Sequence, residues 1–176
     1  MDGRLKRAPG IYLTGFMGSG KTTVARALAD RLGWEFVDLD AEIVARERAS
    51  IADIFDTRGE AEFRRIETEV IRVCVHKVAS GMPAVVALGG GTFVQPENLD
   101  LLENHGISVW LDCPIEIVQD RIAADSAARP LARDSAAFQQ LYEQRREAYG
   151  RATYRIDAGC RVDLAIQRIL ELPFWK

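Results

Sequence analysis

Residues 15–22 constrain the fold of this chain more than any other segment. They read G-F-M-G-S-G-K-T, which has the G-x-x-x-x-G-K-T spacing of a loop that cradles phosphate groups. An apolar run at residues 11–13 precedes the segment, and a helix-forming run at residues 24–29 follows it. Glycines let backbone N–H groups turn inward around an anion, and a helix N-terminus adds partial positive charge. The segment therefore predicts a strand, a phosphate-binding loop and a helix, in that order.

Two side chains of this loop are expected to have different chemical roles. Lys21 should reach the β- and γ-phosphates of a nucleoside triphosphate, and the Thr22 hydroxyl should ligate Mg²⁺. The other expected phosphate-binding positions are Gly18, Ser19, Gly20 and Thr23. The alternative is a glycine-rich turn without a ligand, and the agreement of every motif position and both flanks disfavours it.

Apolar strand candidates alternate with helical stretches along the chain. Strands are expected at residues 10–14, 35–38, 84–88, 108–112 and 154–157. Helices are expected at residues 21–32, 41–48, 51–57, 59–78, 96–104, 115–123, 135–150 and 162–170. The third strand candidate is continuously apolar, which is typical of a strand buried on both faces. The alternation predicts an α/β fold with a parallel sheet covered on both sides and ligands beyond the carboxyl ends of its strands.

Bulk properties limit the classes of protein that remain. With 176 residues, 48% of them hydrophobic, the chain should form one globular domain. Its net charge of −3 is too small to favour a nucleic-acid or membrane partner, and no apolar run approaches the ~20 residues of a membrane span. The three cysteines are widely spaced and odd in number, which argues against disulfides or a zinc site. Residues 1–9 are polar and basic, so we expect a flexible N-terminus on a cytoplasmic protein rather than a secretory signal.

A pair of carboxylates follows the second strand candidate. Period-two alternation at the end of that strand places Asp38 and Asp40 on the same side. Phosphoryl transfer to an alcohol needs one acidic group near the metal and one that orients the hydroxyl and accepts its proton. An isolated D-x-D pair could equally be a helix cap or a solvated turn. Beside a phosphate-binding loop, the pair favours a catalytic interpretation.

Three glycines follow the third strand candidate. Gly89, Gly90 and Gly91 would let a ligand approach the backbone closely, and their N–H groups could bind an anion. A plain tight turn is the alternative interpretation.

A later segment breaks the alternation of strands and helices. Residues 123–134 are small and polar and include Arg129 and Arg133. Pro130 disfavours helix at Arg129, and a loop of this length inside a compact domain is often an active-site lid. A surface loop with incidental arginines is the alternative.

Together these motifs resemble the shikimate kinase family over residues 10–172. The further motifs that carry the resemblance are S-I-A-D-I-F at 50–55, G-E-A-E-F-R-R-I-E at 59–67, L-G-G-G at 88–91, R-P-L at 129–131 and R-x-x-x-Y at 145–149. The phosphate-binding motif is shared by many nucleotide enzymes. The pair formed by residues 59–67 and 88–91, in that order, is much more specific.

The resemblance implies a fold and an activity. The fold would be a three-layer, P-loop domain like that of nucleoside monophosphate kinases, with a five-stranded parallel sheet. This single domain would span residues 1–176 and carry a mobile lid at about residues 122–134. The activity would be transfer of the γ-phosphate of ATP, with Mg²⁺, to the 3-hydroxyl of shikimate, a step toward chorismate and aromatic amino acids. The family default is a monomer.

Two other functions remain open. A kinase of another small hydroxy acid, such as gluconate, would share the loop and the fold. A kinase-fold protein that has lost activity and serves as a binding module should lack Lys21, Asp40 or Arg129, and all three are present.

The resemblance also implies roles for individual residues. Asp40 would hold the shikimate hydroxyls and accept the proton, and Asp38 would face Mg²⁺. Catalysis would further use Lys21 and the lid residue Arg129, which would approach the transferring phosphate. Arg121 would lie against the adenine, although an ordinary exposed helix arginine is the alternative.

Two arginines would clamp the shikimate carboxylate in a pocket lined by Gly89, Gly90 and Gly91. By the resemblance they are Arg64 and Arg145. Planar guanidinium groups bind carboxylates in forks that lysine cannot reproduce, which agrees with this role. Arg64 could instead pair with acidic neighbours on a helix surface, and Arg65 is a neighbouring candidate. Arg146 could be confused with Arg145, but the four-residue spacing to Tyr149 favours Arg145. Whether Arg133 shares the lid role stays open.

Overall fold

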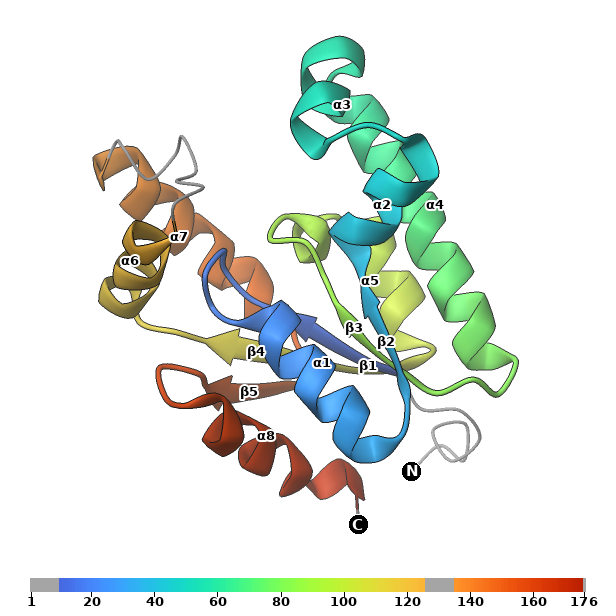
Figure 1. Cartoon of the computed structure of the whole chain (residues 1–176), viewed down its shortest axis with the longest axis vertical. Coiled ribbons are helices and arrows are strands. Elements are labelled where there is room, and N and C mark those ends of the chain that lie inside the picture. The colour runs from blue at the N-terminus through green and yellow to red at the C-terminus, as the bar shows by residue number, and fades with distance from the viewer. Residues whose placement is uncertain (1–9, 126–134, 176) are drawn as a thin grey trace.

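The computed structural model describes residues 10–125 and 135–175 (Figure 1). The expected flexible N-terminus at residues 1–9 lies outside the described residues. Most of the expected lid lies outside them as well, with both Arg129 and Arg133. The first residues of that expected lid, 122–124, are the end of a helix.

A five-stranded parallel sheet forms the centre of the molecule, with strand order β2-β3-β1-β4-β5. The strands are β1 (Gly10–Thr14), β2 (Glu35–Asp38), β3 (Ala84–Ala87), β4 (Gly106–Asp112) and β5 (Tyr154–Asp157). This sheet confirms the expected fold class. The chain passes from β1 to β2 toward one edge of the sheet and from β3 to β4 toward the other. The loop after β1 therefore lies where the strand order reverses, which is where such sheets bind ligands.

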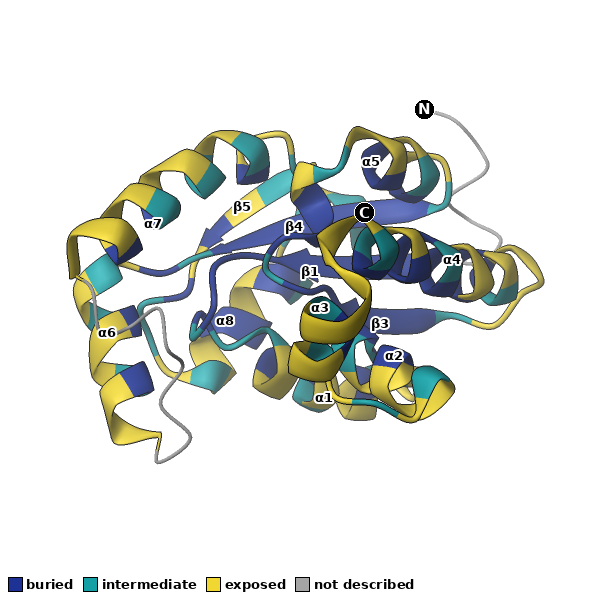
Figure 2. Ribbon diagram, turned by 90° about the horizontal axis from the view of Figure 1, so that it is seen from above, coloured by how far each residue is buried: buried dark blue, intermediate teal, exposed yellow. Residues whose placement is uncertain are grey.

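Helices cover both faces of the sheet (Figure 2). One face carries α1 (Lys21–Leu32) and α8 (Val162–Leu170). The other carries α4 (Glu60–Ala79), α5 (Pro96–Glu103) and α7 (Ser135–Tyr149). The remaining helices are α2 (Leu39–Glu47), α3 (Ile51–Arg58) and α6 (Ile115–Ala124), with 3₁₀ turns at Thr92–Val94 and Pro173–Trp175. Within residues 10–125 and 135–175, every helix is too short or too polar to cross a membrane.

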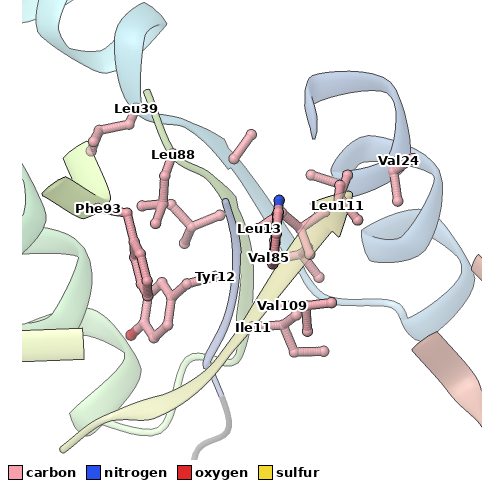
Figure 3. Packing of buried hydrophobic residues seen from close by; sticks show 14 of the residues in the cluster. Ile11, Tyr12, Leu13, Val24, Leu39, Val85, Leu88, Phe93, Val109 and Leu111 are labelled. Atoms are coloured by element: carbon pink, nitrogen blue, oxygen red, sulfur yellow. The ribbon is translucent and has the colours of Figure 1, made fainter. Parts of the chain in front are cut away.

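The core lies on both faces of the central strands. Figure 3 shows the ring of Tyr12 packing with Phe93 on one side of the sheet, while Ile11 and Leu13 pack with aliphatic side chains on the other side. This alternation is the period of two of a strand. All four residues of β3 are buried, which explains its continuous apolar run.

The most informative boundary difference lies at the start of α2. The helix begins at Leu39, two residues earlier than expected, because the Asp38 carboxylate accepts a hydrogen bond from the Ala41 N–H at 3.1 Å and caps the helix. Asp40 therefore belongs to the first turn of a helix. Our argument that strand alternation places Asp38 and Asp40 on one side was wrong, because the strand ends at Asp38.

Candidate active site

The loop between β1 and α1 is built around glycine. Gly15 has a φ of 147°, and a Cβ atom built on it would lie 2.8 Å from the Leu111 carbonyl oxygen of β4. A side chain at Gly15 would therefore push the loop off the sheet. Lys21, the first residue of α1, donates hydrogen bonds from Nζ to the carbonyl oxygens of Gly15 and Phe16 at 2.8 and 2.9 Å. The lysine is thus folded over its own loop, at a helix N-terminus suited to an anion.

A cavity of about 320 Å³ opens beside this loop, at the carboxyl ends of the strands. Its lining combines the loop with Asp38, Asp40 and the first two glycines after β3. The complete lining is Met17, Gly18, Gly20, Lys21, Thr22, Thr23, Asp38, Asp40, Leu88, Gly89, Gly90 and Asp125. The structure thus brings most of the expected phosphate-binding and catalytic residues to one cavity. Met17, Leu88 and Asp125 were not named as site residues, although they lie within the predicted phosphate-binding loop, the L-G-G-G motif and the expected lid.

Two oxygen atoms that could bind a cation lie in contact in the lining of this cavity. The Thr22 hydroxyl donates a 2.7 Å hydrogen bond to Asp38 Oδ2, while Asp38 Oδ1 caps α2. In the part of the chain that the structure describes, no three acidic, histidine or cysteine side chains form a metal site. Mg²⁺ is commonly held by one or two protein oxygens together with water and substrate phosphates. Thr22 and Asp38 therefore fit Mg²⁺.

Asp40 lies between this pair and the glycine run. A Cβ atom built on Gly89 would lie 3.0 Å from Asp40 Oδ1, so the carboxylate packs directly against the backbone of the run. The negative charge of Asp40 also contributes to raising the pKa of Glu67 on α4. Asp40 is thus close both to the phosphate-binding loop and to the charged groups of α4.

Arg64 on α4 points at the end of the glycine run. A Cβ atom built on Gly91 would lie 2.5 Å from Arg64 Nη2. Arg64 Nη1 binds Glu67 Oε2 at 2.9 Å, and Nη2 lies 3.7 Å from Glu60, so the expected alternative pairings do exist. They leave Arg64 Nε buried with no hydrogen-bond partner among the described residues. A buried donor without a partner is unfavourable unless a ligand or water meets it.

Arg65 points away from the cavity. It binds Glu62 and Glu69 on the exposed surface of α4, and its side chain is 56% exposed. The structure therefore favours Arg64 over Arg65 as the arginine of the site.

Glu67 is the centre of a buried polar network. The residue is 1% exposed, and its Oε1 accepts a 2.6 Å hydrogen bond from the Thr92 hydroxyl just after the glycine run. Asn98 of α5 donates from Nδ2 to the Thr92 carbonyl oxygen at 3.0 Å and accepts from the Thr68 hydroxyl at 2.8 Å. The network ties α4, the glycine run and α5 together behind Arg64. From the sequence, Glu67 was considered only as an ion-pair partner of Arg64 and not as the centre of a buried network, although its position on the apolar face of α4 was a usable signal.

The pKa of Glu67 gives a testable pH dependence. Burial raises the pKa of this carboxyl above its ordinary value of 4.5, against the opposing effects of Thr92 and Arg64. The folded state then binds the proton more tightly than the unfolded state, so the stability contributed by protonation is full below about pH 4.5 and is lost as pH rises through the folded pKa. We expect the free energy of unfolding of the wild type, minus that of Glu67→Gln, to fall with rising pH in denaturation titrations. A difference that is flat or rises with pH would contradict this.

Arg145 and Arg146 on α7 point in different directions. A Cβ atom built on Gly90 would lie 2.9 Å from Arg145 Nη1, so Arg145 packs against the middle of the glycine run. Arg146 binds the Asp112 carboxylate and lies over the ring of Trp110, with Cζ 4.9 Å from the ring centroid. The structure therefore favours Arg145 over Arg146 as the second arginine of the site.

A second cavity, of about 180 Å³, lies next to the loop on the side of α8. It is lined by Ser19, Gly20, Thr23, Val24, Arg121, Ala158, Cys160, Val162 and Ala165. Arg121 donates to the carbonyl oxygens of Gly18 at 3.2 Å and Ala158 at 3.3 Å. It is thus a bridge between the loop and the segment after β5, rather than an ordinary exposed helix arginine. The small apolar lining and the adjacent guanidinium plane suit a flat aromatic base.

Comparison with known proteins points to one family. The family model described as shikimate kinase matches residues 17–172. The shikimate kinase of Synechococcus elongatus is 42% identical over 167 residues, covering 92% of this chain and 85% of the relative. The shikimate kinase of Geobacter sulfurreducens is 42% identical over 163 residues, covering 90% and 87%.

Solved structures agree with this result. A shikimate kinase from Acinetobacter baumannii in complex with shikimate has a TM-score of 0.83 and 36% identity, covering 95% of this chain and 93% of that one. A gluconokinase from Sinorhizobium meliloti has a TM-score of 0.59 and 17% identity, covering 93% and 90%. At that identity the second likeness concerns the fold alone.

Proposed function

Because the chain belongs to the shikimate kinase family, we propose that it transfers the γ-phosphate of ATP to the 3-hydroxyl of shikimate, giving shikimate 3-phosphate and ADP. The observation that carries the proposal is the approach of two arginines, from different helices, to one glycine run. Arg64 reaches Gly91 and Arg145 reaches Gly90, beside a cavity that also holds Asp40. Two guanidinium groups suit a carboxylate, and Asp40 suits a hydroxyl. Shikimate offers both groups.

The nucleotide is proposed to lie across the two cavities. The loop N–H groups and Lys21 bind its phosphates, and its adenine occupies the cavity beside Arg121. Thr22 and Asp38 would hold Mg²⁺, which would supply positive charge to neutralise the phosphates. Gly18, Ser19, Gly20 and Thr23 complete the phosphate site. Gluconate as the acceptor is the second candidate, and only a distant likeness of fold favours it.

Each residue of the proposed site then has a distinct role in the transfer. Asp40 orients the 3-hydroxyl and accepts its proton as the oxygen attacks phosphorus. Lys21 holds the charge that develops on the phosphoryl oxygens. Arg64, Arg145 and the backbone of Gly89, Gly90 and Gly91 hold the acceptor so that its hydroxyl meets the phosphate. Arg129 is proposed to approach the same phosphate from the lid, by resemblance to the family alone.

The wider organisation of the protein remains a proposal too. We propose one domain over residues 1–176, with a lid at about residues 122–134. A monomer that acts in the cytoplasm, with shikimate and ATP rather than a nucleic acid or membrane as its ligands, is the expectation that the family resemblance supports.

Replacing Arg64 tests the substrate site. Arg64→Ala should weaken shikimate binding by about 10- to 150-fold, since a hydrogen bond to a charged group contributes roughly 1.5–3 kcal/mol. Calorimetric titration with shikimate, and separately with Mg-ATP, measures both affinities. Arg65→Ala, on the same helix but exposed, is the matched control and should bind both ligands as the wild type does. An equal loss of both affinities in Arg64→Ala, or an equal loss of shikimate affinity in Arg65→Ala, would contradict the assignment.

A further inference from the structure

Helix α7 is fixed at two points about one turn apart, one to strand β4 and one to the glycine run after β3. Arg146 binds Asp112 at the end of β4, and the Tyr149 hydroxyl donates a 2.6 Å hydrogen bond to the carbonyl oxygen of Gly90. Arg145 lies next to the first anchor and one turn before the second. These two contacts therefore constrain the rotation of α7 on both sides of Arg145, and with it the direction of Arg145.

The Tyr149 hydroxyl is a permanent donor at this position. The residue is 1% exposed, and its ring packs near Trp110, with a centroid separation of 6.1 Å. Burial raises the pKa of Tyr149 to about 12, although the neighbouring charge of Arg145 acts in the opposite direction. The hydroxyl therefore keeps its proton at neutral pH, and the bond to Gly90 persists.

Arg145 and Tyr149 converge on the same glycine. A Cβ atom built on Gly90 would lie 2.9 Å from Arg145 Nη1 and 4.0 Å from the Tyr149 hydroxyl oxygen. The two residues are spaced i, i+4 and share one face of α7. Because the hydroxyl binds the carbonyl of Gly90, it fixes the separation between the glycine run and the helix that carries Arg145. Among the described residues, no other side chain of α7 forms a hydrogen bond to the glycine run.

We propose that Tyr149 is a positioning residue for the substrate carboxylate: its hydroxyl holds Gly90 against α7 so that Arg145 and the glycine run present a pocket of fixed width. This inference rests on the proposed function, in which Arg145 binds the carboxylate. Tyr149 acts through Arg145 and Gly90. The tyrosine of R-x-x-x-Y thereby gains a task distinct from that of its arginine.

Removing the hydroxyl alone tests the proposal. Tyr149→Phe keeps the buried ring and should raise the KM for shikimate about 5- to 20-fold, the fold-change of one hydrogen bond of roughly 1–1.8 kcal/mol. The kcat and the KM for ATP should stay within about twofold. Tyr142→Phe is the matched control, because its hydroxyl donates a 2.8 Å bond from the same helix to Cys113 and not to the glycine run. It also removes a 3.0 Å hydrogen bond from Arg146 but leaves the ion pair of Arg146 with Asp112 in place. Even if the two variants have similar melting temperatures, Tyr142→Phe should leave the KM for shikimate unchanged.

A double-mutant cycle tests whether Tyr149 affects shikimate binding through Arg145. In an Arg145→Ala background, adding Tyr149→Phe should change the KM for shikimate by less than about twofold. A full effect in that background, or an equal rise in KM for Tyr142→Phe, would overturn the positioning role. If the wild type turns over shikimate and Arg145→Ala raises the KM while Tyr149→Phe does not, this inference alone fails. A wild type without shikimate-dependent turnover would overturn the proposed function and this inference with it.

Discussion

Replacing Asp40 by asparagine is expected to lower kcat by about 10²- to 10⁴-fold, the usual contribution of a positioned general base. The amide keeps the size of the side chain in the first turn of α2 and its packing against Gly89, but it cannot accept the proton of the acceptor hydroxyl. Steady-state turnover at saturating shikimate and Mg-ATP measures the effect. The far-ultraviolet circular dichroism spectrum should be unchanged.

The matched control is Glu42→Gln. This residue lies in the same first turn of α2, is exposed, and loses the same charge on substitution. It should turn over shikimate at the wild-type rate. An unchanged kcat in Asp40→Asn would remove Asp40 from the mechanism, and an equal loss in both variants would indicate a general electrostatic effect.

Replacing Lys21 by methionine is expected to lower kcat by about 10²- to 10³-fold, as losing one preorganised charge or donor at a reacting centre usually does. Methionine keeps much of the apolar stem but removes the ammonium group that now binds the carbonyl oxygens of Gly15 and Phe16. The same substitution should weaken Mg-ATP binding, which calorimetry measures. Binding of shikimate without nucleotide should stay close to that of the wild type.

Lys77→Met separates this effect from a simple change of charge. Lys77 lies on α4 with Nζ 3.6 Å from the Glu35 carboxylate, and its side chain is 45% exposed. Exposed ion pairs of this kind contribute little to stability, so the control should keep full activity. Lys21→Met with wild-type turnover would show that the loop does not act on the transferring phosphate.

The fold was largely predictable because short local sequence signals mark most of the strands and many of the helix ends. The buried strands are short apolar runs, and glycine or a capping side chain begins or ends several helices, as Gly33 does for α1 and Ser50 for α3. The errors lie at element boundaries, which a single cap or the pairing with a neighbouring strand determines. The Asp38 cap starts α2 early, and pairing with β1 extends β4 back to Gly106.

The candidate site was predictable where one short motif holds several of its groups. The phosphate-binding loop and the glycine run are contiguous in sequence, so their residues could be named without a structure. The choice between Arg64 and Arg65, or between Arg145 and Arg146, depends on helix rotation, which tertiary contacts set. The buried role of Glu67 was missed because its partner Thr92 lies 25 residues away. Such a pairing between α4 and the glycine run has no local signal.

The measurement that tests the central claim most directly is ADP release from Mg-ATP by the purified protein with shikimate, with gluconate, and with no acceptor. We predict release that requires shikimate, together with a product whose phosphorus NMR signal couples to the proton on carbon 3 of the acceptor. Release that is as fast without an acceptor, or that occurs only with gluconate, would contradict the assignment of the acceptor while leaving the phosphate-binding loop in place.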